Sequence, residues 1–445
     1  MKEFRQRILE YQEEFLEDLK SLIEAESIRD LDSAEPGAPF GKGIRTAFDC
    51  FLGIGKRCGF VTEDFDGYAC HAALGDAKEY VGVLGHIDVV EVEPLNQWKT
   101  SPFELYRDSE GVLYGRGVND DKGPLLAALY AMRILKDMKA PLKRSIRVIA
   151  GGAEETTWEC MEHYFSKNEQ PVMGFSPDGN FPVVNGEKGI RKYDLEFPMN
   201  VRNDEGEYTL LEAKSKTIEN YVCSNFGVLY ERQGACQTGT WTGKPSLSRN
   251  PQRGENALWK FAKQFSDKVF IQDGVNRLVC FLNECLTGDF YGKKMGIFSE
   301  DEIMGMTSVC PTGVELSGDM LHLYLDIRYH KSVQPEALDR RIGELAEQYG
   351  FSFRVAAQKR LLYVPEESEL IQALKNAYTA VTGEKAEVLT KGGASYARTL
   401  DCGVAFGASF EGEEANPHMP NECMPLASLL KAMEIYCEAL WKLTV

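Results

Sequence analysis

Short apolar runs in the first half of the chain are each followed by acidic residues or a histidine. The runs and the residues that follow them are 80–85 with His86, 145–150 with Glu154 and Glu155, and 171–175 with Asp178. Between the first two runs, the segment 124–136 begins with a proline, is rich in leucine and alanine, and predicts a helix. Strands that alternate with helices form a mixed, mostly parallel sheet with helices on both faces. Because ligands bind beyond the carboxyl ends of such strands, these polar side chains are predicted to share one site.

The pattern of the sequence changes near residue 191. Residues 193–197 and 321–327 alternate apolar and polar side chains, which is typical of half-exposed antiparallel strands. Helical periodicity returns at 368–382 and 426–443. We therefore expect an α/β domain that is interrupted by an inserted α+β domain. The expected boundaries are 1–189 for the first part of the α/β domain, 190–357 for the inserted domain and 358–445 for the second part.

Composition disfavours several classes of function. The 445 residues include 68 acidic and 50 basic side chains, and the resulting formal charge of −18 disfavours binding to nucleic acid or to anionic membranes. The N-terminal segment lacks the apolar core of a signal peptide, and no stretch approaches the roughly 18 apolar residues of a membrane span. The 12 cysteines form no Cys-x-x-Cys pair and are expected to be free thiols. We expect a cytoplasmic protein.

Five segments carry side chains that bind hard or borderline metal ions. They are 86–88, 115–123, 154–155, Asp178 and 416–422. Imidazole and carboxylate ligands without thiolates suit zinc or manganese in a hydrolytic site. A pair of ions about 3.5–4 Å apart needs one bridging carboxylate and further ligands for each ion. Two histidines, two aspartates and one glutamate meet that requirement, and one glutamate remains to move protons.

Six motifs of the chain resemble those of a known superfamily, in the same order and spacing. They lie at 85–88, 114–124, 154–155, 175–182, 185–189 and 392–398. The resemblance is to the co-catalytic zinc aminopeptidases, carboxypeptidases, dipeptidases and acylases, and within them the chain is most similar to the PepV-type bacterial dipeptidases, relatives of carnosinase. It covers nearly the whole chain. It implies a zinc-peptidase fold with a lid, and a lid of this size favours a monomer because it replaces dimer contacts.

The resemblance also implies a role for each residue of the metal site. Asp120 would bridge two divalent ions, zinc or manganese. The implied further ligands are His86 and Asp178 for one ion, and Glu155 and His418 for the other. Glu154 would be the general base that takes a proton from the attacking water. Asp88 would accept a hydrogen bond from the His86 ring and fix its tautomer.

The resemblance extends to residues that would bind the substrate. An asparagine and an arginine of the family's lid grip the substrate carboxylate, and they correspond to Asn220 and Arg328 here. Arg398 is a second candidate for the carboxylate, and it lies close to Tyr396 in the glycine-rich segment 392–398. We expect these four side chains to contact the substrate.

One position departs from the family's pattern. A lid histidine that polarises the scissile carbonyl has no counterpart, because Leu247 occupies its place. A donor of this kind is commonly worth about 2.7–4 kcal/mol in the transition state. Three explanations stay open. Another residue such as Lys244, Arg249 or His330 replaces the histidine, the match is displaced by one loop, or the protein is a hydrolase of weak or altered specificity.

The sequence thus predicts a metallopeptidase that cleaves dipeptides, with small peptides as its partners. Within enzymes the alternatives are an N-acyl-amino-acid deacylase and a carboxypeptidase. The alternative from a different class is a pseudoenzyme that binds peptides without cleaving them, and Leu247 alone motivates it.

Overall fold

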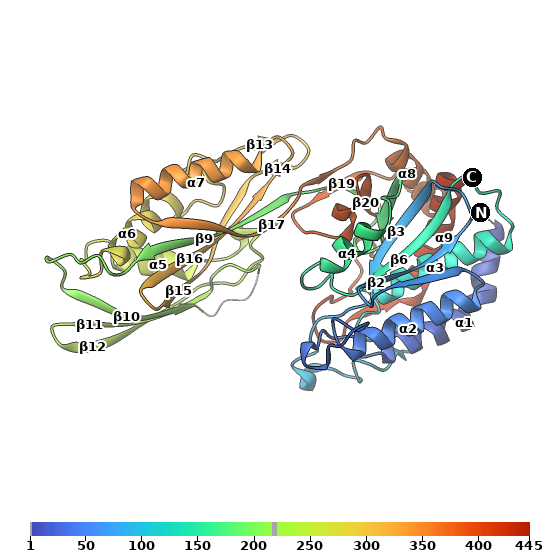
Figure 1. The fold of residues 1–445 in the computed structure, drawn as a ribbon, viewed down its shortest axis with the longest axis horizontal. Coiled ribbons are helices and arrows are strands. Elements are labelled where there is room, and N and C mark those ends of the chain that lie inside the picture. Colours follow the sequence, from blue (N-terminus) through green and yellow to red (C-terminus); the bar gives the residue numbers. More distant parts are fainter. Residues whose placement is uncertain (1, 216–219) are drawn as a thin grey trace. The chain divides into compact units, whose positions relative to one another are not determined.

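The computed structural model describes residues 2–215 and 220–445, which fold into two compact units (Figure 1). Unit 1 comprises Met1–Gly186, Leu362–Leu389 and Ala394–Val445, and unit 2 comprises Glu187–Leu361 and Thr390–Gly393. Unit 1 therefore contains both ends of the chain. Phe4 of helix α1 (Lys2–Glu24) packs edge-on against Trp441 of helix α9 (Leu426–Thr444) and joins the two ends.

A mixed nine-stranded sheet forms the centre of unit 1, as the sequence predicts. Its strand order is β1-β2-β6-β3-β7-β20-β8-β18, and β19 pairs with β8. The four central strands are parallel, whereas β1, β2 and β8 pair antiparallel on either side of them. The strands are β1 (Val61–Phe65), β2 (Ala69–Leu74), β3 (Tyr80–His86), β6 (Ser145–Gly151), β7 (Met173–Ser176), β8 (Val183–Glu187), β18 (Leu362–Tyr363), β19 (Val388–Lys391) and β20 (Gly403–Ala405).

Helices cover both faces of this sheet. His71 of β2 contacts Tyr164 of helix α4, whereas its neighbour Ala72 lies against Gly55 of helix α2. Because successive residues of a strand point to opposite faces, α4 and α2 lie on opposite sides of the sheet. Helices α3 and α9 pack against each other and against β3 and β6. The helices are α2 (Lys42–Arg57), α3 (Lys122–Asp137), α4 (Glu159–Lys167) and α8 (Glu369–Thr382).

Unit 2 is built on a seven-stranded antiparallel sheet in the order β12-β11-β10-β15-β16-β9-β17. Along β9, Tyr193, Leu195 and Phe197 enter a hydrophobic core, and the alternate residues Asp194 and Glu196 are polar. The elements are β9 (Gly189–Pro198), β10 (Tyr208–Ser215), β11 (Asn225–Arg232), β12 (Ala235–Thr242), α5 (Ala257–Gln264), α6 (Asp273–Phe281), β15 (Ser308–Ser317), β16 (Met320–Tyr329), α7 (Pro335–Tyr349) and β17 (Ser352–Lys359).

Two small sheets complete the fold. In unit 1, β4 (Tyr106–Arg107), β5 (Val112–Tyr114) and β21 (Cys423–Pro425) form a three-stranded sheet in the order β21-β5-β4. In unit 2, β13 (Glu300–Asp301) pairs with β14 (Gly305–Met306). Within the described residues, none of the helices has the length and apolar character that crossing a membrane requires.

Candidate metal centre

The five predicted ligands lie near the carboxyl ends of the central parallel strands or in the loops beside them. His86 is the last residue of β3. Glu155 follows β6, and Asp178 follows β7. Asp120 lies in the loop that precedes α3, and His418 lies in the loop that precedes β21. The alternation of strands and helices thus brings residues from distant parts of the sequence to one edge of the sheet.

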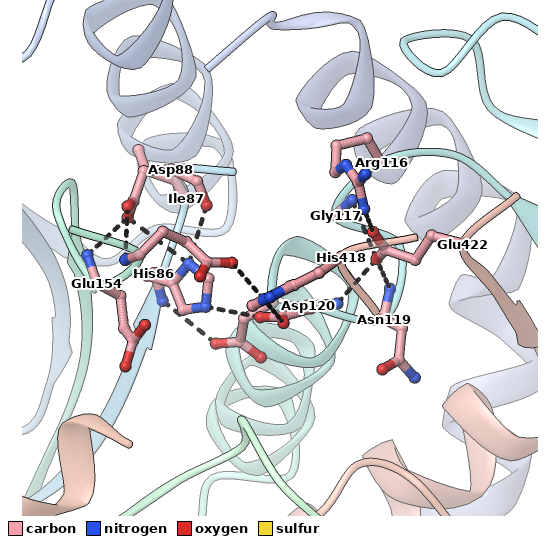
Figure 2. A network of polar contacts seen from close by, with 12 residues as sticks. His86, Ile87, Asp88, Arg116, Gly117, Asn119, Asp120, Glu154, His418 and Glu422 are labelled. Carbon is pink, nitrogen blue, oxygen red and sulfur yellow. Dashed lines mark hydrogen bonds and ion pairs between the residues drawn. The ribbon is translucent and has the colours of Figure 1, made fainter. Parts of the chain in front are cut away.

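The ligand atoms form two clusters that share Asp120. Within each cluster the atoms lie within 4.8 Å of one another, and the clusters are His86–Asp120–Asp178 and Asp120–Glu155–His418. Asp120 Oδ1 lies 2.9 Å from His86 Nε2, and Asp120 Oδ2 lies 3.0 Å from His418 Nε2. Figure 2 shows Asp120 between the two imidazoles. One carboxylate therefore presents one oxygen to each cluster, which is the arrangement that a bridging ligand needs.

The carboxylates around His86 and His418 shift the pKa values of these two histidines. Hydrogen bonds with Asp120 and Glu155 raise the pKa of His418 to about 11. Burial alone would lower the pKa of His86, but the interactions with Asp120 and Asp88 outweigh burial and raise it. Burial and the charge of Asp120 raise the pKa of Glu155. The cluster thus concentrates acidic side chains around the two imidazoles.

The donor set suits a divalent ion of the zinc or manganese type. It consists of imidazole nitrogens and carboxylate oxygens, and the described residues place no cysteine in either cluster. His86 is buried, whereas the side chain of His418 is 53% exposed. The residues present therefore fit the hydrolytic metal site that the sequence predicts.

Asp88 contacts the His86 ring through its main-chain carbonyl and not through its carboxylate. The His86 Nδ1–H donates to the main-chain carbonyl of Asp88 at 2.9 Å, whereas the nearer carboxylate oxygen lies 3.6 Å away. The carboxylate instead accepts the backbone N–H groups of Glu154 and Glu155, at 3.1 and 3.0 Å. Asp88 still fixes the tautomer of His86, with Nε2 facing Asp120, but it does so through its backbone. Its side chain positions the loop that carries Glu154 and Glu155.

Tyr396, a predicted substrate contact, is buried. Its hydroxyl lies 2.7 Å from Cys160 Sγ, and its ring packs edge-on against His86 and Trp158. Tyr396 therefore packs beside His86. Arg398 follows in the same 3₁₀ turn and is also buried.

The predicted carboxylate-binding residues of unit 2 form a network around Arg328. Asp326 accepts two hydrogen bonds from Arg328 Nε and Nη2, both at 2.7 Å, so the guanidinium charge is already paired. Arg328 Nη2 also lies 3.3 Å from Asn220 Oδ1, and Nη1 donates to the Gly392 carbonyl at 3.1 Å. The network is a rigid support, because a bidentate Arg–Asp pair fixes the plane of the guanidinium.

Leu247 is half-buried and forms a β-bridge with Tyr221. Because the leucine side chain is apolar, this position offers no side-chain donor. Arg249 lies two residues further on. A Cβ added to Gly393 would come within 2.8 Å of Arg249 Nη1, so the guanidinium lies against this glycine backbone. Burial and the charge of Arg328 lower the pKa of Arg249. No carboxylate within the described residues forms an ion pair with it. His330, by contrast, is fully buried.

A third group of acidic residues and histidine in unit 2 differs from the first two clusters. Asp194, Glu196 and His322 lie within reach of one another. Arg354 Nη2 lies 2.6 Å from Asp194 and Arg354 Nε lies 3.6 Å from Glu196, so an arginine already balances both carboxylates. The ion pairs with Arg354 account for the proximity of these acidic side chains.

Two buried carboxylates of the site were given no role by the sequence analysis. Asp121 accepts the backbone N–H of His86 at 3.2 Å, and burial raises its pKa. Glu422 accepts the backbone N–H groups of Gly117, Asn119 and Asp120 (Figure 2). In the sequence, the indication of a role for Asp121 and Glu422 was that each lies close to a predicted ligand, Asp120 or His418.

The chain matches the model of peptidase family M20/M25/M40 over residues 82–442. It belongs to that family. A Staphylococcus epidermidis protein named "Putative dipeptidase" is 34% identical, with 99% of each chain covered, and "Putative dipeptidase YtjP" of Bacillus subtilis is 31% identical, with 98% covered. The crystal structure of human carnosine dipeptidase 1 has a similar fold, with a TM-score of 0.64 at 16% identity over 99% of this chain and 98% of that one. This M20/M25/M40 peptidase is a metal-dependent hydrolase with a mixed α/β fold.

Metal binding to this M20/M25/M40 peptidase should release protons. A metal ion needs a neutral imidazole, whereas His418 is charged below about pH 11 because its pKa is raised. Protons therefore compete with the metal, and the affinity for zinc should fall as the pH is lowered through the neutral range. Calorimetric titration of zinc into EDTA-treated protein, in buffers of different ionisation enthalpy, measures the protons released. A binding heat that is independent of the buffer at neutral pH would contradict this description of the site.

Proposed function

We propose that this peptidase is a dipeptidase that uses two divalent metal ions, zinc or manganese. His86 and Asp178 would hold one ion, Glu155 and His418 the other, and Asp120 both. The observation that carries the proposal is the position of Asp120, whose two oxygens face the two histidines at 2.9 and 3.0 Å. Similarity to relatives named as dipeptidases supports the choice of substrate class.

The bound ions would supply Lewis acidity, which polarises the scissile carbonyl and acidifies the attacking water. Glu154 is the residue that moves the proton. It follows β6 and immediately precedes the ligand Glu155, and Asp88 holds the backbone amides of both glutamates. Glu154 would take a proton from the attacking water and return it to the leaving amine. The other residues of the site keep this carboxylate and the ligands in fixed positions.

Arg249 is our candidate for binding the carboxylate of the dipeptide. Arg328 was the sequence-based candidate, but its charge is paired with Asp326 and its donors are engaged. Arg249 lies beside Arg328 and against the Gly393 backbone, and within the described residues it forms no ion pair with a carboxylate. We propose that Arg328, with Asn220 and Asp326, is the support on which Arg249 presents a free guanidinium. Arg398 stays a second candidate.

The retained ligand set and Glu154 favour a hydrolase that is compensated or altered in specificity over the loss of activity, although Leu247 offers no donor. An N-acyl-amino-acid deacylase or a carboxypeptidase would use the same ligands, and turnover of substrates that differ in length and in their free amino group distinguishes them. The monomeric state and the cytoplasmic location stay predictions of the sequence.

Replacing Glu154 by glutamine should abolish proton transfer while the metal ions remain bound. General acid–base groups typically contribute a factor of about 10²–10⁴, so kcat for dipeptide hydrolysis should fall by about that factor. The measurements are kcat on a panel of dipeptides, including β-alanyl dipeptides, and the zinc content of each protein. Glu162→Gln is the matched control, because Glu162 is an exposed glutamate of the following helix.

Unchanged kcat in the Glu154→Gln variant would eliminate Glu154 as the base. If wild-type protein loaded with zinc or with manganese binds dipeptides but cleaves none of them, the pseudoenzyme alternative is correct.

Replacing Arg249 by methionine should weaken the binding of substrates that have a free carboxylate. A hydrogen bond to a charged group contributes about 1.5–3 kcal/mol, which corresponds to an increase in KM of roughly 10- to 100-fold. Dipeptide amides lack the carboxylate, so their KM should change little. Arg253→Met is the control, because Arg253 is an exposed arginine of the same loop. An equal loss for acids and amides would exclude a carboxylate-binding role.

A further inference from the structure

Glu422 is a fully buried carboxylate whose two oxygens are both engaged. Oε1 accepts the backbone N–H groups of Gly117, Asn119 and Asp120, at 3.1, 2.9 and 3.0 Å. Oε2 accepts a hydrogen bond from Arg116 Nη1 at 2.8 Å. The relative exposure of Glu422 is 0%, so all four contacts form away from solvent. A carboxylate in such a position costs much desolvation energy, and these contacts must offset it.

The partner of Glu422 is itself fixed. Arg116 is buried, its Nη2 donates to the Glu91 carbonyl at 3.2 Å, and its guanidinium lies over the Trp98 ring, 5.1 Å from the ring centroid. The pair is therefore anchored by residues outside the ligand loops. Burial raises the pKa of Glu422, whereas Arg116 and the Asn119 amide act in the opposite direction.

Glu422 also connects the two loops that carry Asp120 and His418. It lies four residues after His418, and its carbonyl accepts the N–H of Gly115 at 3.2 Å. The next residue, Cys423, pairs with Tyr114 where β21 meets β5. One residue thus fixes the start of the 115–120 loop through its backbone and the end of that loop through its side chain. Figure 2 shows Glu422 beside Arg116, Gly117 and Asn119, on the side of Asp120 away from His86.

We propose that Glu422 is a positioning residue that sets the metal affinity of both clusters by holding Asp120. Asp120 is the one ligand that both clusters contain, and its own backbone N–H is a donor to Glu422. A shift of the loop would therefore move a ligand of both ions together. The inference rests on the metal binding of the proposed function, but not on the identity of the substrate.

The test is zinc binding by the Glu422→Gln variant. Glutamine has nearly the same shape, but only its carbonyl oxygen can accept hydrogen bonds. Either Arg116 or the three backbone amides therefore faces the NH2 group and loses its acceptor. Outer partners of this kind typically change metal affinity by about 10- to 100-fold, and we expect the zinc dissociation constants of both sites to rise by about that factor. Competition with a chromophoric chelator measures them without any substrate. Glu411→Gln is the control, because Glu411 is exposed and precedes His418 in the same loop.

A second readout separates positioning from general stabilisation. If Glu422 positions Asp120, activity of Glu422→Gln at limiting zinc should be low and should recover when zinc is raised to saturation. Zinc dissociation constants within twofold of wild type, together with a lower unfolding midpoint in EDTA, would overturn the proposal and show a purely structural role. Weakening of one site alone would also overturn it, because Asp120 belongs to both.

A second variant keeps the test decisive if Glu422→Gln does not fold. Arg116→Lys retains the charge but loses the planar fork that fixes the Glu422 carboxylate, so both zinc dissociation constants should rise, by a smaller factor. Wild-type affinity in a folded Arg116→Lys protein would contradict the proposal. Failure of the proposed function is separate from these outcomes, because it would appear as an absence of zinc binding or of dipeptide hydrolysis in the wild-type protein.

Discussion

The metal centre depends on hydrogen bonds from backbone amides to buried carboxylates of neighbouring loops. Asp88 accepts the amides of Glu154 and Glu155, and Asp121 accepts the amide of His86. Glu422 does the same for the loop that ends at Asp120. Three ligands are thus held by a carboxylate that lies elsewhere in the sequence. Hydrogen bonds to a charged group are worth about 1.5–3 kcal/mol each, about twice those between neutral groups, so loops held this way are fixed before a ligand binds.

This arrangement concentrates negative charge, and the protein must balance it. The buried carboxylates Asp88 and Glu422 lie beside the carboxylates of the two clusters, in a chain whose formal charge is −18. Arg116 balances Glu422, and the neighbouring carboxylates raise the pKa values of both histidines. Divalent ions would balance the carboxylates of the clusters. The acidic composition is therefore partly a property of the site and not only of the surface.

The sequence predicted the fold, and the clustering of polar side chains at one edge of the sheet, where the pattern is local. The apolar runs that precede His86, Glu155 and Asp178 form strands β3, β6 and β7, and the two clusters lie near the carboxyl ends of these strands, as the alternation of strands and helices predicts. The central strands are parallel and the outer ones antiparallel, which gives the predicted mixed sheet. These features follow from periodicity and from the general geometry of α/β sheets.

The sequence could not predict which atoms pair inside the site. Asp88 uses its carbonyl for His86 and its carboxylate for two amides, and that choice depends on the path of the 154–155 loop. Tyr396 stands in a loop that resembles a binding loop, yet its ring packs behind His86. Arg328 is paired with Asp326 two residues away, and only side-chain geometry shows that its guanidinium is already engaged. Such pairings are set by long-range packing.

The most direct measurement of the central claim is the position of the metal ions in protein reconstituted with zinc. Anomalous diffraction at the zinc edge should show two ions about 3.5–4 Å apart, one on each side of Asp120, with His86 and Asp178 on one ion and Glu155 and His418 on the other. A single ion at full zinc occupancy, or two ions that do not share Asp120, would contradict the account.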